Sequence, residues 1–272
     1  MSDALTSREY KTILKKERFS DAEQGVSDFW ERVGKHTTAI LEEPWKRKER
    51  LVWYSDTTDH QLKRKYSYSF RERRKLDDDG KLEKRRKVSL KFRADSEAEQ
   101  AGLDFMPTKG KEPDQKFETD VILDVDAHGA ATDPRVRYSR SGAAEFKMKK
   151  KFRTIADVAL VFPVLRDLGL GDAKLTTVRE IYAVEHKFEN GRLALGDCEA
   201  EVAFTVWYES DRKASPGDLL LAEFSFDFDI SSSCDNAAHE EARRVLKSLG
   251  SADWMKKGSE TKTEIVYGPP PE

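Results

Sequence analysis

Pairs of like charges two or four positions apart, on segments of alternating hydropathy, are the residues best suited to chemistry in this sequence. The pairs are Arg71 and Arg73, Lys91 and Arg93, and Glu223 and Asp227. Alternate side chains of a strand share a face, so the members of each pair point to the same side of a sheet. Guanidinium and ammonium groups on neighbouring strands predict multidentate contacts to phosphate oxygens.

The acidic pair complements such a phosphate site. Carboxylate oxygens are the ligands that the hard cation Mg²⁺ prefers, and Mn²⁺ accepts the same donors. A metal held there would neutralise phosphate charge and orient a water molecule for attack on the terminal phosphorus. The basic and acidic strands together therefore predict a site for a polyanion such as a triphosphate and a divalent cation.

A hydropathy period of two residues dominates the chain and predicts strands. In the segment 219–229, for example, Phe224, Phe226 and Phe228 alternate with serine and charged residues. The predicted strands are 7–14, 50–55, 66–75, 88–93, 117–125, 145–152, 177–188, 201–209 and 219–229. Strands of this kind are expected to pair as hairpins in an antiparallel sheet.

Helices and turns are less numerous. Helices are predicted over 20–33, 155–168 and 236–249, the second interrupted by Pro163. Asn190-Gly191 predicts a hairpin turn between two strands. The stretch 94–115 shows no period and is expected to be a loop, and the proline-rich stretch 268–272 is expected to be a disordered tail.

The strand count and the placement of aromatic residues predict the fold. About eight strands are enough to close a barrel. Large aromatic side chains on one face suit packing under helices, which turns the charged face inward, where opposite charges or bound ions must compensate it. We therefore expect an α+β chain with an eight-stranded antiparallel β-barrel, a tunnel with a charged interior flanked by a few helices.

The overall balance of charge argues against a nucleic-acid or membrane partner. The 272 residues include 49 basic and 51 acidic ones, which leaves a net charge of −2. The basic run 84–87 lacks interleaved aromatic residues and is interpreted as a solvated hairpin arm. No apolar run reaches the length of a membrane span, and no signal-peptide pattern precedes the first strand, so we expect a cytoplasmic protein.

The two cysteines, Cys198 and Cys234, show no metal-binding spacing. Reduced thiols in a cytosolic protein are the simplest interpretation, and a disulfide between the two cysteines stays open. The five histidines show no metalloprotease or catalytic-triad pattern. Neither residue type therefore contributes a predicted site.

Two motifs resemble signatures of the CYTH / triphosphate tunnel superfamily, which includes thiamine triphosphatases, inorganic triphosphatases, class IV adenylate cyclases and distant RNA triphosphatases. The segment SREYK at 7–11 resembles the E-x-E-x-K of its first strand, with Ser7 in place of the first glutamate. The segment EFSFD at 223–227 resembles its E-x-E-x-E strand, with Ser225 in place of another glutamate.

Other motifs occur in the same order as in that superfamily. WYSDTTD at 53–59 resembles its Y-F-D-T-P strand end, and YSFRER at 68–73 resembles its L-R-I-R strand. VSLK at 88–91 resembles its L-T-L-K strand, and KFETD at 116–120 resembles its R-x-E-x-E element. Each motif is short, but together they span nearly the whole chain, with 94–115 and 126–143 matching least.

The resemblance implies a role for each charged residue of the tunnel. Glu9, Glu223 and Asp227 would bind Mg²⁺ or Mn²⁺, and Glu118 and Asp120 would serve catalysis by extending the acidic wall or orienting water. The implied phosphate-binding residues are Lys11, Arg71, Arg73, Lys91, Arg93, Lys147, Arg179 and Lys262. Serine is a poorer ligand for Mg²⁺ than a carboxylate, so Ser7 and Ser225 imply either weaker metal binding or a site that needs only the remaining carboxylates.

The function implied is a metal-dependent triphosphate phosphohydrolase, formed by a single domain over 1–267. It would release orthophosphate from inorganic triphosphate, a nucleoside triphosphate or thiamine triphosphate. One alternative is a non-catalytic module that binds triphosphate or polyphosphate, which the two serines favour. The other is an adenylate cyclase of the class IV type. The sequence sets neither the substrate nor the oligomeric state.

Overall fold

The computed structural model describes residues 4–126, 128, 130–231 and 234–269, and its strands join in a single sheet. The strands are β1 (Ser7–Leu14), β2 (Ala39–Ile40), β3 (Lys46–Asp56), β4 (Tyr68–Lys75), β5 (Arg85–Ala94), β6 (Lys111–Ile122), β7 (Arg135–Lys147), β8 (Thr176–Leu195), β9 (Cys198–Ser210) and β10 (Pro216–Asp229). The helices are α1 (Ala22–Val33), α2 (Gln61–Arg64), α3 (Ile155–Ala159), α4 (Asn236–Ser248) and α5 (Lys262–Tyr267).

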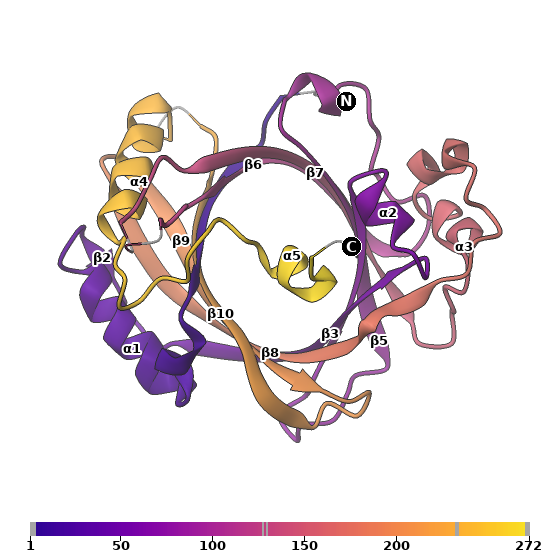
Figure 1. Cartoon of the computed structure of the whole chain (residues 1–272), viewed down its shortest axis with the longest axis horizontal. Coiled ribbons are helices and arrows are strands. Elements are labelled where there is room, and N and C mark those ends of the chain that lie inside the picture. The colour runs from indigo at the N-terminus through magenta and orange to yellow at the C-terminus, as the bar shows by residue number, and fades with distance from the viewer. Residues whose placement is uncertain (1–3, 127, 129, 232–233, 270–272) are drawn as a thin grey trace.

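The sheet closes on itself into a barrel of nine strands (Figure 1). The order around the ring is β8-β3-β4-β5-β7-β6-β1-β10-β9, and the pairing of β8 with β9 closes it, while the short β2 adds to the edge of β8. β1 runs antiparallel to β10 but parallel to β6. The expected β-barrel is confirmed, but it has nine strands and not eight, and one of its pairs, β1 with β6, is parallel and not antiparallel. Two parallel strands must be joined by a long crossover connection, which here is the chain from α1 to β5. A local sequence pattern does not predict such a pairing.

The seventh strand and one turn also differ from the sequence-based expectation. The predicted strand 145–152 overlaps only the end of β7, whose inward-facing residues include Ser139, Ser141 and Ala143 and so carry little hydropathy signal. Asn190-Gly191 is no hairpin turn but a bulge inside the long strand β8. A Cβ at position 191 would lie 2.5 Å from the Trp45 ring, so glycine is needed there for close packing.

Apolar side chains cover the outside of the barrel beneath the helices. Tyr10, Phe224 and Phe226 pack in one core with Phe29 of α1 and Val245 of α4. The ring centroids of Phe29 and Phe224 are 5.2 Å apart. Figure 1 shows α1 and α4 on one side of the ring and α3 on the other. The helices therefore leave the opposite, polar face of each strand to line the interior, as the alternation predicts.

A second outer core covers the other side of the barrel. Phe70 of β4 and Leu90 of β5 are fully buried against Val158 of α3 and Phe162. The predicted helix 155–168 is two pieces, α3 and a 3-10 turn at Pro163–Leu168. Proline at 163 separates them, because it cannot donate a backbone hydrogen bond and clashes with the preceding turn.

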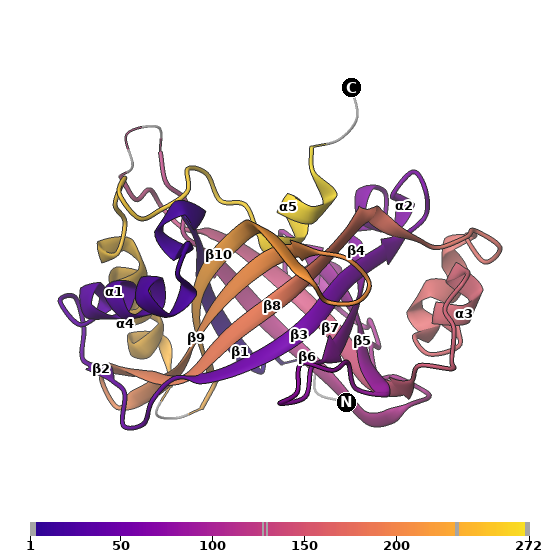
Figure 2. The ribbon, with the colours of Figure 1, turned by 90° about the horizontal axis from the view of Figure 1, so that it is seen from below.

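The short helix α5 lies across one mouth of the barrel (Figure 1). Its Val266 and Tyr267 form an apolar cluster with inward residues of the barrel, among them Tyr54 and Trp207. The side view in Figure 2 places α5 at one end and the β4–β5 hairpin at the other end. α5 was not predicted, because its six residues are too few to show a helical period.

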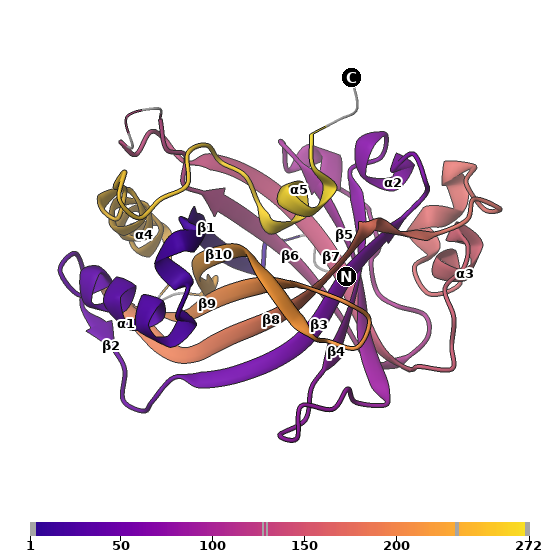
Figure 3. The same ribbon diagram turned by 60° about the horizontal axis from the view of Figure 1, so that its bottom comes forward.

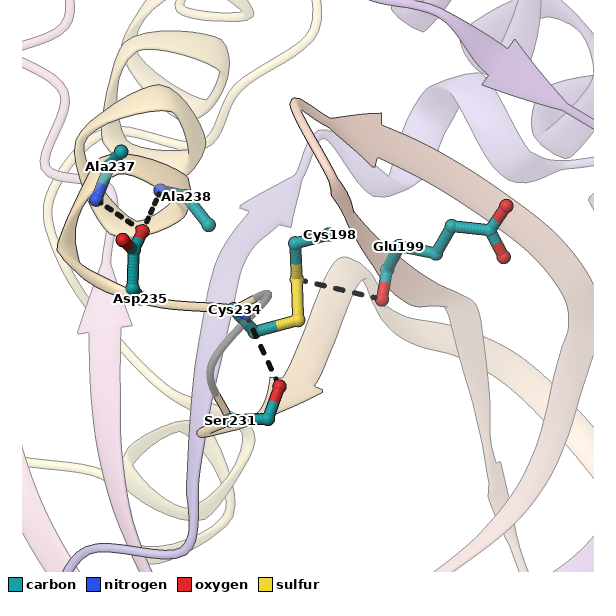
Figure 4. The surroundings of a disulfide bond; sticks show 7 residues. All are labelled: Cys198, Glu199, Ser231, Cys234, Asp235, Ala237 and Ala238. Carbon is teal, nitrogen blue, oxygen red and sulfur yellow. Dashed lines mark hydrogen bonds between the residues drawn. A yellow bond between two sulfur atoms is a disulfide. The ribbon is translucent and has the colours of Figure 1, made fainter.

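The two cysteines form a disulfide, which corrects the interpretation of reduced thiols (Figure 4). Cys198 opens β9, and Cys234 immediately precedes Asp235, which caps α4 by accepting hydrogen bonds from the backbone of Ala237 and Ala238. The Cα atoms of the cysteines are 4.9 Å apart although 36 positions separate them in the chain. The fold of the barrel brings the two cysteines together, so their spacing in the sequence did not indicate that they form a disulfide.

Two remaining expectations concern the ends of the chain and membranes. Of the predicted tail 268–272, Gly268 ends α5 with a φ of 68° and Pro269 is also described, whereas 270–272 lie outside the described residues. Among the helices that the structure describes, none has the length and apolar composition needed to cross a membrane.

Candidate functional site

Charged side chains line the barrel in two facing groups. In the ring, three strands separate β4 from β1 in one direction and from β10 in the other, so these strands stand opposite one another. Figure 3 shows the same barrel tilted, with β10 and β1 facing β3, β4 and β5 across the interior. β4 and β5 contribute mostly cations to the interior, whereas β1, β6 and β10 contribute most of the carboxylates.

Three carboxylates form the centre of the acidic group. Oxygens of Glu9, Glu118 and Asp120, here called the carboxylate cluster, lie within 4.8 Å of one another. The register explains the cluster, because β1 and β6 run side by side with Glu9 opposite Asp120. Oxygen donors this close together could hold a metal ion. The parallel pairing of β1 with β6, absent from the prediction, is what assembles the cluster.

Cations interleave with these carboxylates. Lys11 Nζ lies 2.7 Å from Asp120 Oδ1 and also pairs with Glu9. Lys91 Nζ lies 2.6 Å from Glu118 Oε1 and 3.4 Å from Asp120 Oδ1, and Arg93 Nε lies 2.9 Å from Asp120 Oδ2. Asp120 is fully buried, so these pairs satisfy a charge that would otherwise be very costly.

Small residues on β7 allow these contacts. β7 lies between β5 and β6 in the ring, and the register places Ser141 beside Lys91 and Ser139 beside Glu118. Because a serine side chain is short, Lys91 reaches Glu118 across the intervening strand. The small residues of β7 are therefore needed for these contacts. The same residues give β7 a weak hydropathy pattern, which is why most of this strand was not predicted.

The carboxylates differ sharply in acidity. Burial alone would raise the pKa of Asp120, but Lys11, Lys91 and Arg93 outweigh it and hold the pKa well below its usual value. For Asp227 the balance is reversed. Burial, together with the negative charges of Glu9, Glu118 and Glu201, raises its pKa to about 6 despite Lys116 nearby.

Asp227 marks the part of the site with excess negative charge. Its side chain makes no hydrogen bond or ion pair with any residue that the structure describes. It lines a cavity of about 500 Å³ together with Lys187, Glu189 and Glu201. β8 meets α5 near Val178 and meets this cavity near Lys187, so the cavity opens at the mouth opposite α5. A divalent cation among these oxygen donors would relieve their repulsion, so the residues fit a metal.

The opposite side of the barrel carries cations without partners. The side chains of Arg71, Arg73 and Lys87, here called the basic wall, make no hydrogen bond or ion pair within the described part of the chain. Burial and the neighbouring charges of Arg71 and Arg50 lower the pKa of Arg73 to about 9. Burial and the charge of Arg73 likewise lower the pKa of Lys87. Half-buried cations that repel one another form a ready site for an anion.

Sequence reasoning missed four residues of this region, Lys87, Arg50, Glu185 and Trp207. Lys87 lies directly opposite Arg73 in the register of β4 and β5 and shares the inward face of Lys91. Arg50 pairs with the buried Glu185 at 2.8 Å, and Trp207 Nε1 donates to Glu185 at 2.9 Å. Lys87 lies one position before the predicted strand 88–93, so a longer strand would have included it.

The remaining predicted residues lie apart from these two groups. Glu223 is buried and pairs with Lys262 of α5, so this predicted metal ligand and this predicted phosphate ligand contact each other. Arg179 is exposed at the mouth covered by α5, where it donates to the backbone carbonyls of Ile265 and Val266. Lys147 is exposed at the end of β7. Their roles in phosphate binding stay predictions.

The two serines of the motifs also lie in the barrel interior. Ser7 stands opposite Glu118 and Asp229, and Ser225 stands opposite Lys11. Both serines are buried. Replacing two expected carboxylates by hydroxyls keeps the negative charge near Lys11 low enough to be matched by the cations there.

Comparison with known proteins finds similarity in structure but not in sequence. No protein-family model matches the chain, and none of the curated proteins is similar to it. One similar solved structure is a candidate adenylyl cyclase from Hippeastrum, described as having a dominant triphosphatase activity. It aligns with a TM-score of 0.45 and 12% identity over 96% of this chain and 95% of that chain.

A second similar structure is a protein from Pyrococcus horikoshii. It aligns with a TM-score of 0.34 and 11% identity over 96% of this chain and 97% of that chain. At these scores the likeness carries no functional argument, so the function must be inferred from the residues of the barrel.

Proposed function

We propose that this chain is a divergent member of the CYTH / triphosphate tunnel superfamily that hydrolyses a triphosphate inside its barrel with the help of Mg²⁺ or Mn²⁺. The observation that carries the proposal is the basic wall. The side chains of Arg71, Arg73 and Lys87 face the interior of a closed barrel, opposite a group of carboxylates, and none of them pairs with a residue that the structure describes. Proteins rarely keep such charges half-buried unless a ligand compensates them.

Each side of the barrel would have its own task. The basic wall would donate to phosphate oxygens, with Arg73 at its centre between Arg71 and Lys87. Asp227 and Glu9 would hold the metal, which when bound supplies charge neutralisation and activates water. The cavity beside Asp227 leaves this part of the site open to solution.

Glu118 and Asp120 would act in different ways. Asp120 already accepts from Lys11, Lys91 and Arg93, so its task would be to position those cations. Glu118 pairs only with Lys91 and Ser139 among the described residues, so one of its oxygens stays available to orient a water molecule. The low pKa of Asp120 makes it a weak base.

A non-catalytic triphosphate-binding module is the second candidate. The ion pairs of Lys11, Lys91 and Arg93 with the carboxylate cluster favour it, because these cations already neutralise the oxygens that a metal would need. Triphosphate binding would then depend on the basic wall alone.

Phosphate release tests the proposal. Orthophosphate is measured with inorganic triphosphate, ATP and thiamine triphosphate, each with Mg²⁺, Mn²⁺ or a chelator. Arg73→Ala should lower kcat/KM by about 10- to 100-fold, because it removes charge-assisted hydrogen bonds worth about 1.5–3 kcal/mol. Arg166→Ala, a change of an exposed arginine outside the barrel, is the matched control and should behave as wild type.

Glu118→Gln separates hydrolysis from binding. A hydrolase should lose turnover in this variant while inorganic triphosphate still raises its melting temperature. Thermal stabilisation without turnover in the wild type would instead establish the binding module. Pyrophosphate with a cyclic nucleotide would identify a cyclase. Neither turnover nor stabilisation by any of the three compounds would refute the proposal.

A further inference from the structure

Two carboxylates lie at the point where two neighbouring strands of the barrel separate. β9 and β10 pair in register as far as Glu201 and Asp227, which stand directly opposite each other and are here called the terminal pair. Beyond them β9 continues to pair with β8 as far as Cys198, whereas β10 continues to pair with β1 as far as Asp229. The terminal pair is therefore the last position at this end where β9 and β10 are joined by their ladder.

The charges of the terminal pair work against this junction. Directly opposite side chains of antiparallel strands have Cβ atoms about 5 Å apart, and like charges in that position are destabilising. Both side chains line the cavity of about 500 Å³. Neither makes a hydrogen bond or an ion pair with a residue that the structure describes. Their repulsion therefore favours separation of the two strands at the wall of the cavity.

Cations near the terminal pair compensate this repulsion only in part. Three cations line the same cavity, and each already pairs with a carboxylate outside the terminal pair. They are Lys48 and Lys187, which pair with Glu189, and Arg192, which pairs with Glu199. Lys116 attracts Asp227 but forms no ion pair with it within the described part of the chain. A divalent cation between the two carboxylates would compensate them better.

The disulfide closes the gap just beyond the terminal pair. Cys198 is the first residue of β9, and Cys234 lies in the segment that follows β10. The Cα atoms of the two cysteines are 4.9 Å apart, which is about the distance between paired strands. The bond thus takes the place of the missing ladder and opposes the repulsion of Glu201 and Asp227.

We propose that Cys198 and Cys234 are positioning residues, whose disulfide holds the terminal pair together for a divalent cation and whose reduction weakens binding of that ion. The inference rests on the metal site of the proposed function and adds Glu201 to it as a ligand. In the reduction, a dithiol gives two electrons and two protons to the bond, which becomes two thiols while the dithiol becomes a disulfide. Because coupling between two sites is reciprocal, a bound ion in turn makes the disulfide harder to reduce.

Binding of Mn²⁺ to the oxidised and the reduced wild type tests the inference. The electron paramagnetic resonance signal of free Mn²⁺ gives both dissociation constants, at a temperature where circular dichroism shows both forms folded. Reduction should weaken Mn²⁺ binding about ten-fold, within the usual range of coupling between two sites. Equal affinities would overturn the inference and leave the proposed function intact. Absence of Mn²⁺ binding in both forms would refute the metal site and the inference together.

The reduction potential of the disulfide gives a second measurement, which holds even where the reduced form is too unstable for titration. A ten-fold difference in affinity corresponds to about 30 mV for a two-electron reduction, so saturating Mn²⁺ should lower the potential by about that amount. Mixtures of reduced and oxidised dithiothreitol at fixed pH set the potential, and alkylation counts the free thiols. A potential that Mn²⁺ leaves unchanged would overturn the inference.

Glu201→Gln separates a positioning role from mere support of the fold. The variant keeps the disulfide but removes one charge of the terminal pair, so the metal-free disulfide should be about two- to five-fold harder to reduce. The shift caused by Mn²⁺ should shrink, because one ligand is weaker. The matched control Glu209→Gln changes an exposed glutamate at the other end of β9 and should leave both quantities unchanged. If Glu201→Gln behaves like this control, the disulfide only supports the fold and the inference fails.

Discussion

Two aspartates in the same interior show how neighbours decide the acidity of a residue. Asp120 is surrounded by Lys11, Lys91 and Arg93 and stays ionised, whereas Asp227 faces Glu9, Glu118 and Glu201. Environments that push two carboxyl groups in opposite directions are typical of sites where acids and bases have separate tasks. Neither residue type nor spacing distinguishes the two in the sequence.

The raised pKa of Asp227 predicts a pH-dependent stability. Its pKa is about 6 in the folded state against an ordinary value of 3.8, so the folded state binds more protons between these values. The free energy of unfolding contributed by Asp227 therefore falls as the pH rises from about 4 to about 6. Asp227→Asn removes this penalty and should be more stable than wild type at about pH 7.5 and equal to it near about pH 4.

Chemical denaturation at both pH values measures the effect. Asp229→Asn, a change on the same strand at an exposed position, is the control and should follow the wild-type profile. A difference between Asp227→Asn and wild type that is the same at both pH values would contradict the assignment of the raised pKa to Asp227.

At the scale of elements, a covalent bond ties a helix to the barrel. The disulfide joins the β8–β9 hairpin to the segment that leads from β10 into α4 (Figure 4). Both cysteines are buried, and Asp227 and Glu201 lie on the strands that the bond connects. The bond therefore restrains one side of the cavity in which we place the metal.

Loss of the disulfide should lower the free energy of unfolding by about 3 to 4 kcal/mol, the usual cost for a loop of this length. Denaturation of the wild type with and without a reductant measures it. The double variant Cys198→Ser and Cys234→Ser should match the reduced wild type and should not respond to reductant. An unchanged unfolding midpoint on reduction would mean that the bond contributes little in solution.

At the scale of the whole molecule, charges that nearly cancel in sum are separated in space. The net charge is −2, yet the basic wall lies on β4 and β5, whereas carboxylates gather on β1, β6 and β10. Salt screens exposed charges strongly and buried charges much less. Binding of an anion to the half-buried basic wall should therefore depend little on ionic strength.

Raising the salt concentration from about 0.05 M to about 0.5 M should weaken binding of inorganic triphosphate by less than about ten-fold, because half-buried charges are screened weakly. Titrations of triphosphate into the wild type with a chelator at each salt concentration measure the effect. A loss of about a hundred-fold or more would show that the ligand binds exposed charges and not the basic wall. Arg166→Ala, a change at an exposed position outside the barrel, is the control and should lose affinity to the same extent as the wild type.

The local pattern of residues determined most strands and the side to which their charges point. β1 coincides with the prediction, and the predicted strands of β4, β5 and β10 lie within a few residues of the observed ones. Side chains alternate between the two faces of every strand. A segment with aromatic residues on one face and charged residues on the other therefore predicts which face packs under the helices and which faces the interior. This is why Arg73, Lys91 and Asp227 could be assigned to the interior from the pattern of the sequence, whereas Glu9 and Lys11 were placed there only by the resemblance.

Only the tertiary structure decided which charges meet. The parallel pairing of β1 with β6 places Glu9 beside Asp120, and closure of the ring places the basic wall across from both. The tertiary structure also places Arg179 at the mouth covered by α5 and brings the two distant cysteines into a disulfide. Strand partners depend on long-range packing that a local pattern does not encode, so the sequence determined the composition of the site and the fold determined its geometry.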